Sequence, residues 1–156
     1  MGIEDIERDI YSTFASIAST IGYSEIHGRI IAALMVSGNR LSLQELAEKA
    51  GYSLSTLSLS LDLLEFFGMI KKIKNAGDRK LYVELQGDLI EGLKNAFVIK
   101  IQKSVTDSLE RFKKYKEDLR VSKDKDKERV EQVLNILEKD IQRVDKYINL
   151  LSKLKL

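Results

Sequence analysis

The stretch from residue 42 to residue 85 constrains the fold of this chain more than any other. Ser42 and Glu45 have the spacing of a capping box, in which each side chain pairs with a free backbone N–H at the start of a helix. Gly51 suits the left-handed conformation that ends many helices, and Ser53 is placed to cap a second helix. The pattern therefore predicts two helices joined by a turn of about three residues.

The second helix of this pair carries a leucine stripe that predicts its buried face. The leucines recur at steps of three or four residues, which places them on one side of a helix: Leu54, Leu57, Leu61 and Leu64. Gly68 is expected to end this helix. Leu63 and Phe66 lie off the stripe, and we expect both to pack against another helix because large apolar side chains are seldom left exposed together.

Two short segments after Gly68, residues 69–74 and 80–85, have the pattern of β-strands. Apolar and polar residues alternate in the second segment, and the turn-forming sequence Asn75-Ala76-Gly77-Asp78 separates the two. Leu41 is expected to add one short strand to this hairpin. Helix, turn, helix and hairpin in this order predict a winged helix-turn-helix, a fold that usually binds nucleic acid.

Amphipathic helices are predicted on both sides of this domain. Near the N-terminus, apolar residues recur at helical spacing over about five turns: Ile3, Ile6, Ile10, Phe14, Ile17 and Ile21. Ser24 is expected to cap the helix that follows, and Asp88 a helix of about 30 residues. Residues 122–128 alternate in charge and contain no apolar residue, which fits either a turn between two helices or a solvated helical link.

The last segment has an unbroken heptad pattern, typical of a helix that packs along another helix. Its apolar residues are Val130, Leu134, Leu137, Ile141, Val144, Ile148 and Leu151. A bundle helix within one chain is one interpretation. Because the terminal helices carry more apolar surface than a small winged domain can cover, we favour a homodimer.

The expected fold class is therefore mainly α with a small β hairpin. The expected domains are an N-terminal dimerisation helix, a winged helix-turn-helix domain that binds double-stranded DNA, and a C-terminal helical dimerisation region. Their predicted boundaries are 1–22, 23–86 and 87–156.

The composition predicts a cytoplasmic globular protein without a cofactor. The chain is 44% apolar and 32% charged, which excludes a disordered protein, and it has no cysteine for a thiolate metal site. No apolar run is long enough to cross a membrane, and the acidic N-terminal segment is unlike a signal peptide. His27 is the only histidine and has no neighbouring metal ligands in the sequence. No catalytic or phosphate-binding motif stands out, so an enzyme is not expected.

Positive charge is concentrated in the predicted hairpin. The whole chain has a net charge of +2, whereas residues 69–80 carry five basic side chains against one acidic. A local excess of this kind favours phosphate contacts, because electrostatic attraction is strongest at short range. Ordinary solvated strand lysines are the alternative interpretation.

The candidate DNA-binding residues form two groups. Small hydroxyls and one leucine lie in the helix-turn-helix, where they can reach base edges or phosphates: Ser42, Ser53, Ser55, Thr56, Ser58 and Leu59. The hairpin supplies cations: Lys71, Lys72, Lys74, Arg79 and Lys80.

Arg79 and Asp62 have two interpretations each. Arg79 at the turn is the candidate for insertion into an A·T-rich minor groove; its alternative is an ion pair with Asp78 or Glu84. Asp62 in the second helix repels phosphate, unless it accepts a hydrogen bond from a cytosine amino group or pairs with a neighbouring cation.

Three segments together carry a family resemblance: Ser-Leu-Gln-Glu-Leu-Ala at 42–47, the leucine-rich run from Tyr52 to Ile70, and Gly-Asp-Arg-Lys-x-Tyr at 77–82. This pattern resembles the MarR superfamily, and within it the GbsR-like group, the glycine-betaine-synthesis-repressor type. The resemblance implies a homodimeric transcriptional regulator whose terminal helices interlock and whose wings span a palindromic operator, and we expect this regulator to be a repressor. It also implies a small-molecule effector between the DNA-binding and dimerisation parts. A winged helix that binds an acidic protein partner is the alternative function.

Overall fold

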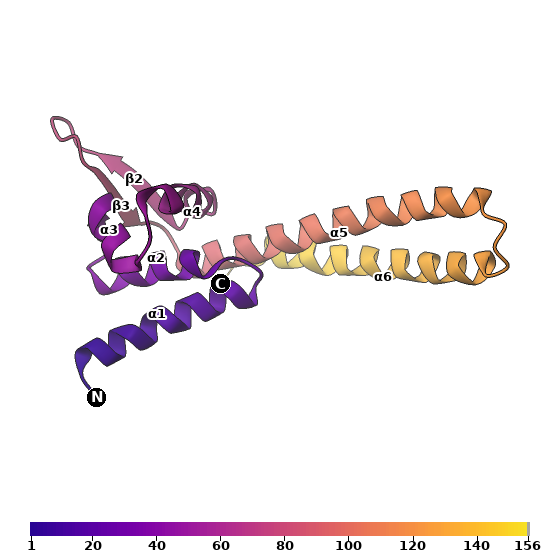
Figure 1. The fold of residues 1–156 in the computed structure, drawn as a ribbon, viewed down its shortest axis with the longest axis horizontal. Coiled ribbons are helices and arrows are strands. Elements are labelled where there is room, and N and C mark those ends of the chain that lie inside the picture. The colour runs from indigo at the N-terminus through magenta and orange to yellow at the C-terminus, as the bar shows by residue number, and fades with distance from the viewer. Residues whose placement is uncertain (156) are drawn as a thin grey trace. The chain divides into compact units, whose positions relative to one another are not determined.

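The computed structural model describes residues 1–155 and has six helices and a three-stranded antiparallel sheet in that range (Figure 1). The elements are α1 (Ile3–Thr20), α2 (Glu25–Val36), β1 (Arg40–Ser42), α3 (Leu43–Ala50), α4 (Leu54–Phe66), β2 (Ile70–Lys74), β3 (Leu81–Leu85), α5 (Leu89–Val121) and α6 (Lys127–Lys153). They form two compact units, Met1–Leu93 and Lys94–Leu156. The expected fold class is confirmed, whereas the domain boundaries stay a prediction.

The helix-turn-helix forms as its capping residues predict. The Glu45 N–H donates to Ser42 Oγ at 3.2 Å, and the Ser42 N–H donates to Glu45 Oε2 at 3.1 Å. Gly51 ends α3 with φ +81°. Ser53 Oγ then accepts a hydrogen bond from the Thr56 N–H at 3.3 Å, so a turn of three residues separates α4 from α3.

The core of the first unit combines α2, α3, α4 and the sheet. Its largest fully buried side chains are Ile30, Leu34, Leu46, Leu57, Leu61, Ile70 and Val83. On α4 the predicted stripe is confirmed for Leu57, Leu61 and Leu64 but is wrong for Leu54, which is 46% exposed. Leu54 is the first residue of the helix, and Ser60 in its middle is buried although it is polar.

The expectation that Phe66 packs against another helix is also wrong, since Phe66 is 71% exposed. At 100° per residue it lies opposite the buried stripe of α4, so no element of the first unit covers it. Leu63 lies to the side of the stripe and is half-buried.

The sheet has the order β1-β3-β2, and the predicted pairing of Leu41 with the hairpin is confirmed. Leu41 lies opposite Val83, and β2 pairs with β3 from Ile70 opposite Leu85 to Lys74 opposite Leu81. Val83 is fully buried and anchors the hairpin to the helices. The turn beyond Lys74 projects away from the helices of this unit (Figure 1).

Helices α1 and α2 pack at very close range. Ala15 and Ala18 of α1 are buried, and a Cβ atom placed on Gly28 of α2 would lie 2.0 Å from the carbonyl oxygen of Phe14. Ser24 occupies the N-cap position of α2, but its side chain makes no capping hydrogen bond. Small residues therefore allow the close approach of α1 to α2, whereas three isoleucines of the predicted stripe remain exposed: Ile3, Ile6 and Ile17.

In the second unit α5 and α6 run antiparallel, side by side (Figure 1). The segment between them is a turn, as the first of its two interpretations predicted. Lys94 Nζ donates to the Leu154 carbonyl oxygen at 2.6 Å, and Lys116 forms an ion pair with Glu138. Asp88 caps α5 as predicted, because its Oδ1 accepts from the Ile90 N–H at 2.8 Å.

The heptad residues of α6 divide into two rows. Leu134 and Ile148 are buried in the helix pair, whereas Val130, Leu137 and Val144 remain exposed. Packing within one chain therefore accounts for only part of the heptad pattern.

Candidate nucleic-acid interface

A cluster of hydroxyl groups marks the N-terminal end of α4. Ser53 Oγ lies 3.2 Å from Ser55 Oγ and 2.8 Å from Thr56 Oγ1, and all three residues are exposed. Ser58 is exposed one turn further on, beside Leu59, which is 79% exposed. The exposed start of α4 therefore offers hydrogen-bond donors and acceptors together with one apolar contact.

Ser42 lies away from this exposed cluster. Its residue is buried, its hydroxyl accepts the capping hydrogen bond of α3, and its backbone lies opposite Tyr82 in the sheet. These contacts give Ser42 a structural role at the start of α3, and its hydroxyl is not exposed for contact with DNA.

Asp78 organises the hairpin turn. The Asp78 N–H donates to the Asn75 carbonyl oxygen at 3.2 Å, and Gly77 has φ +81° as this tight turn requires. Asp78 Oδ1 accepts from the Lys80 N–H at 2.9 Å, and its Oδ2 accepts from the Tyr82 hydroxyl at 3.2 Å. Both carboxylate oxygens are thus engaged in holding the turn.

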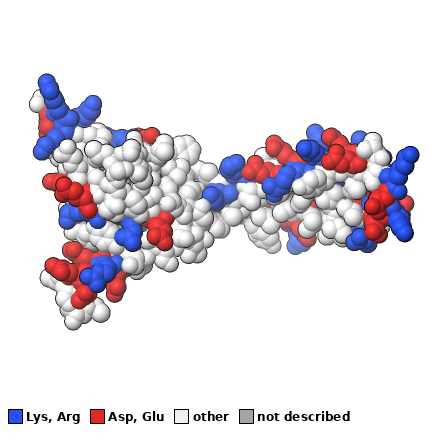
Figure 2. All heavy atoms as spheres, viewed as in Figure 1, with Lys and Arg blue, Asp and Glu red and all other residues white. Residues whose placement is uncertain are grey.

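Four of the five predicted hairpin cations are exposed and free: Lys71, Lys74, Arg79 and Lys80. Their side chains make no ion pair or hydrogen bond with any residue of the range 1–155. The alternative interpretation of Arg79 is wrong, because Asp78 holds the turn and Glu84 lies 4.0 Å from Arg40. Figure 2 shows the resulting group of basic side chains at the hairpin tip.

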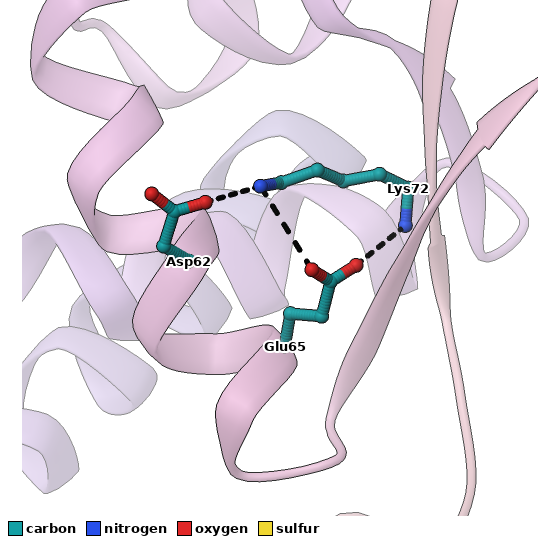
Figure 3. A network of polar contacts seen from close by, with 3 residues as sticks. All are labelled: Asp62, Glu65 and Lys72. Carbon is teal, nitrogen blue, oxygen red and sulfur yellow. Dashed lines mark hydrogen bonds and ion pairs between the residues drawn. The ribbon is translucent and has the colours of Figure 1, made fainter.

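Lys72 differs from the other four cations. Its ammonium forms an ion pair with Asp62 and lies 3.9 Å from Glu65 Oε1, and its backbone N–H donates to Glu65 Oε2 at 3.2 Å (Figure 3). Its side chain is only 26% exposed. Lys72 is therefore turned toward α4 and is not free to bind a phosphate as Lys71 or Lys74 are. Of the two interpretations of Asp62, the structure shows the pairing with a cation.

Arg40 supports the base of the hairpin and was not among the predicted residues. Its guanidinium lies 4.7 Å from the centre of the Tyr82 ring and 4.0 Å from Glu84. A signal for it existed in the sequence: once Leu41 pairs with Val83, its neighbour Arg40 must lie opposite Glu84.

An aromatic cluster lies elsewhere in the first unit. Tyr23 meets Phe67 edge to face at 5.5 Å between ring centres and meets His27 at 6.0 Å. Phe66 and Phe67 are 5.8 Å apart. Burial raises the pKa of the Tyr23 hydroxyl, so this side chain stays neutral near pH 7.

No helix of residues 1–155 is both long and apolar enough to cross a membrane. The same residues contain no group of three or more side chains placed to hold a metal ion.

Comparisons with known proteins establish the fold of the chain. No family model and no curated protein matches the sequence. Among solved structures, one described only as a transcriptional regulator is 21% identical with a TM-score of 0.56, covering 94% of this chain and 96% of the other. The identity is too low to establish more than a shared fold.

Two further solved structures match with lower TM-scores. NadR in complex with 4-hydroxyphenylacetate is 19% identical with a TM-score of 0.44, covering 99% of this chain and 92% of the other. The PcaV transcriptional regulator from Streptomyces coelicolor is 18% identical with a TM-score of 0.41, covering 66% and 77%. These scores add nothing to the likeness of fold.

Proposed function

We propose that this protein is a DNA-binding transcriptional regulator of the MarR type, GbsR-like, and that it acts as a repressor. The observation that carries this proposal is the pairing, in one winged unit, of an exposed hydroxyl cluster on α4 with four unpaired cations on the hairpin. The hydroxyls and Leu59 suit base edges in the major groove, and the cations suit phosphates.

The hairpin supplies the electrostatic part of the binding energy. Helix α4 contains no lysine or arginine between its first residue and Phe66. Each phosphate that a cation neutralises adds about −0.9 to the slope of log K against log salt concentration. The free hairpin cations are therefore expected to set most of that slope.

Replacing Arg79 with alanine tests its proposed insertion into the minor groove. A narrow A·T-rich minor groove has a strongly negative potential that attracts a guanidinium. We expect Arg79→Ala to weaken binding to duplexes with A·T-rich flanks by roughly 1–3 kcal/mol, and binding to G·C-flanked duplexes less. Fluorescence anisotropy with two duplexes that differ only in the flanks measures this difference. Equal losses on both would exclude the minor-groove role and leave a plain phosphate contact.

We also propose that the regulator is a homodimer built from its terminal helices. Exposed apolar residues remain on α1 (Ile3, Ile6, Ile17) and on α6 (Leu137, Val144, Leu150). Large apolar side chains that stay exposed along a helix suit an interface between protein chains. A two-fold dimer presents two wings and requires a palindromic operator with two half-sites.

Control by a small-molecule effector is the remaining part of the proposal. In the cluster of Tyr23, His27, Phe66 and Phe67 the Phe66 ring is exposed and the Tyr23 ring is half-buried, and aromatic faces attract quaternary ammonium groups. Choline or glycine betaine at about 100 times its Kd is expected to stabilise the fold by about 2.7 kcal/mol, and so to raise the Tm in a thermal melt. Tyr23→Ala serves as the control, since it removes one ring of the cluster. A Tm that stays constant up to millimolar ligand would exclude both compounds as effectors.

A protein-interaction module is the second candidate, favoured by one observation. Leu59 and Phe66 are largely exposed on the same side of α4, which carries no cation. Such a face suits an apolar partner surface, while the hairpin would contact an acidic patch. Duplex binding that weakens steeply between about 50 and 200 mM salt supports the DNA-binding proposal. Absence of duplex binding at about 50 mM salt would favour the protein partner.

A further inference from the structure

Asp62 lies on the solvent-facing side of α4. At 100° per residue, the exposed residues Ser55, Leu59, Asp62 and Phe66 fall within about 60° of one another, on the side opposite the buried row of Leu57, Leu61 and Leu64. The Asp62 side chain is 62% exposed. In the proposed complex the solvent-facing side of α4 enters the major groove, which brings the Asp62 carboxylate within reach of base edges.

Only one oxygen of the Asp62 carboxylate is engaged. Lys72 of β2 donates to Oδ1, and Oδ2 has no hydrogen-bond partner within residues 1–155. Figure 3 shows this second oxygen turned away from Lys72. Asp62 therefore keeps a free acceptor on the exposed side of the helix.

Glu65 holds Lys72 in place beside Asp62. One Glu65 oxygen accepts from the Lys72 backbone N–H at 3.2 Å, and the other lies 3.9 Å from the Lys72 ammonium (Figure 3). Glu65 thus contacts both the backbone and the ammonium group of Lys72, the residue that orients Asp62. The three side chains together carry a net charge of −1, which repels phosphate but attracts a hydrogen-bond donor.

We propose that Asp62 is a specificity-determining residue that accepts a hydrogen bond from the exocyclic amino group of cytosine, and that Lys72 positions its carboxylate. This inference rests on the proposed function. Lys72 then contributes to DNA recognition through Asp62 and makes no phosphate contact of its own.

The chemistry of the major groove explains the choice of cytosine. Guanine presents two acceptors there and thymine presents an acceptor and a methyl group, so neither offers a donor to a carboxylate. Adenine offers its N6 amino group, but the neighbouring N7 acceptor repels a second carboxylate oxygen. Cytosine offers its N4 amino group without an adjacent acceptor on the same edge, and it is the base that Asp and Glu select.

Selection of duplexes from a randomised pool, with the full-length protein and its variants, tests this assignment. The wild-type protein is expected to prefer cytosine at one position of the bound sequence by about fivefold or more. Asp62→Ala is expected to abolish that preference. Asp62→Asn is expected to shift it to adenine, because an amide both donates to N7 and accepts from N6. A change of base preference is not a result that loss of stability produces.

Two further variants complete the test. Glu110→Gln is the matched control, since it removes one negative charge from an exposed position of α5 outside the proposed interface, and the cytosine preference is expected to persist. Lys72→Met is expected to weaken the preference severalfold without reducing the salt slope on a scrambled duplex. If Lys72→Met instead reduces the salt slope of duplex binding by about 0.9 and leaves the cytosine preference intact, Lys72 is a phosphate contact and its positioning role is overturned.

The remaining outcomes are also decisive. Duplex binding with the same base preferences in wild type, Asp62→Ala and Asp62→Asn would overturn the assignment of Asp62 while leaving the proposed DNA binding in place. Absence of duplex binding by the wild-type protein would overturn both.

Discussion

Replacing Lys71, Lys74, Arg79 and Lys80 together with alanine is expected to reduce duplex affinity by more than about a hundredfold at roughly 100 mM salt. The four side chains are the exposed, unpaired cations of the hairpin. Since each phosphate contact contributes about 0.9 to the salt slope, loss of all four should flatten that slope by up to about 3.6. Titration of one duplex at several salt concentrations measures both quantities.

A control variant with the same change in charge makes this result specific. Lys113, Lys114, Lys123 and Lys125 are also exposed and lie in the second unit. Their joint replacement with alanine is expected to leave most of the affinity and slope intact. Comparable losses in the two variants would mean that net charge, and not the hairpin, drives the binding.

Gly28→Val is expected to cause the largest loss of stability. The added Cβ would meet the Phe14 carbonyl oxygen at 2.0 Å and the Phe14 carbonyl carbon at 2.3 Å, so α1 must move off α2. Overpacking of this kind costs about 1–3 kcal/mol, and the backbone contact places Gly28 at the upper end. For a chain of this size we expect the Tm to fall by roughly 6–12 °C.

The stability measurement requires a control in the same helix. Met35 of α2 is exposed, so Met35→Val introduces a β-branched residue without a clash. Its Tm is expected to change by no more than about 1–2 °C, because exposed substitutions usually cost less than about 0.5 kcal/mol. An unchanged Tm for Gly28→Val would show that the two helices can separate freely and would contradict their close packing.

Local signals in the sequence predicted much of the winged unit correctly. Ser42, Glu45, Gly51 and Ser53 determine where the two helices start and stop through contacts within a few residues of each other. The hairpin follows equally from alternation and the turn at Asn75–Asp78. Such features depend on neighbours along the chain, which periodicity and capping preferences describe.

Features that depend on contacts between distant elements were not predictable in the same way. Asp62 and Lys72 pair because β2 returns alongside α4, and their sequence separation gives no sign of that contact. The hairpin cations therefore looked equivalent in the sequence, although one of the five is engaged with α4. Likewise, periodicity places Leu54 on the buried face of α4 but does not indicate whether another element covers the first turn of the helix. Leu54 is exposed there.

The heptad of α6 shows a related limit. Its regular spacing predicts a packed helix but not how many partners the helix has. Leu134 and Ile148 are buried in the pair with α5, while Leu137 and Val144 stay exposed. The proposed homodimer would cover the exposed row, which the spacing by itself does not distinguish from the buried one.

Selection of bound duplexes from a fully randomised pool by the full-length protein, at about 150 mM salt, tests the central claim most directly. A dimeric winged-helix regulator is expected to enrich an inverted repeat whose half-site centres are about 10–10.5 base pairs apart, or a multiple of that distance. Enrichment of a single unrepeated site would contradict the dimer. A pool without any enriched sequence would contradict sequence-specific DNA binding itself.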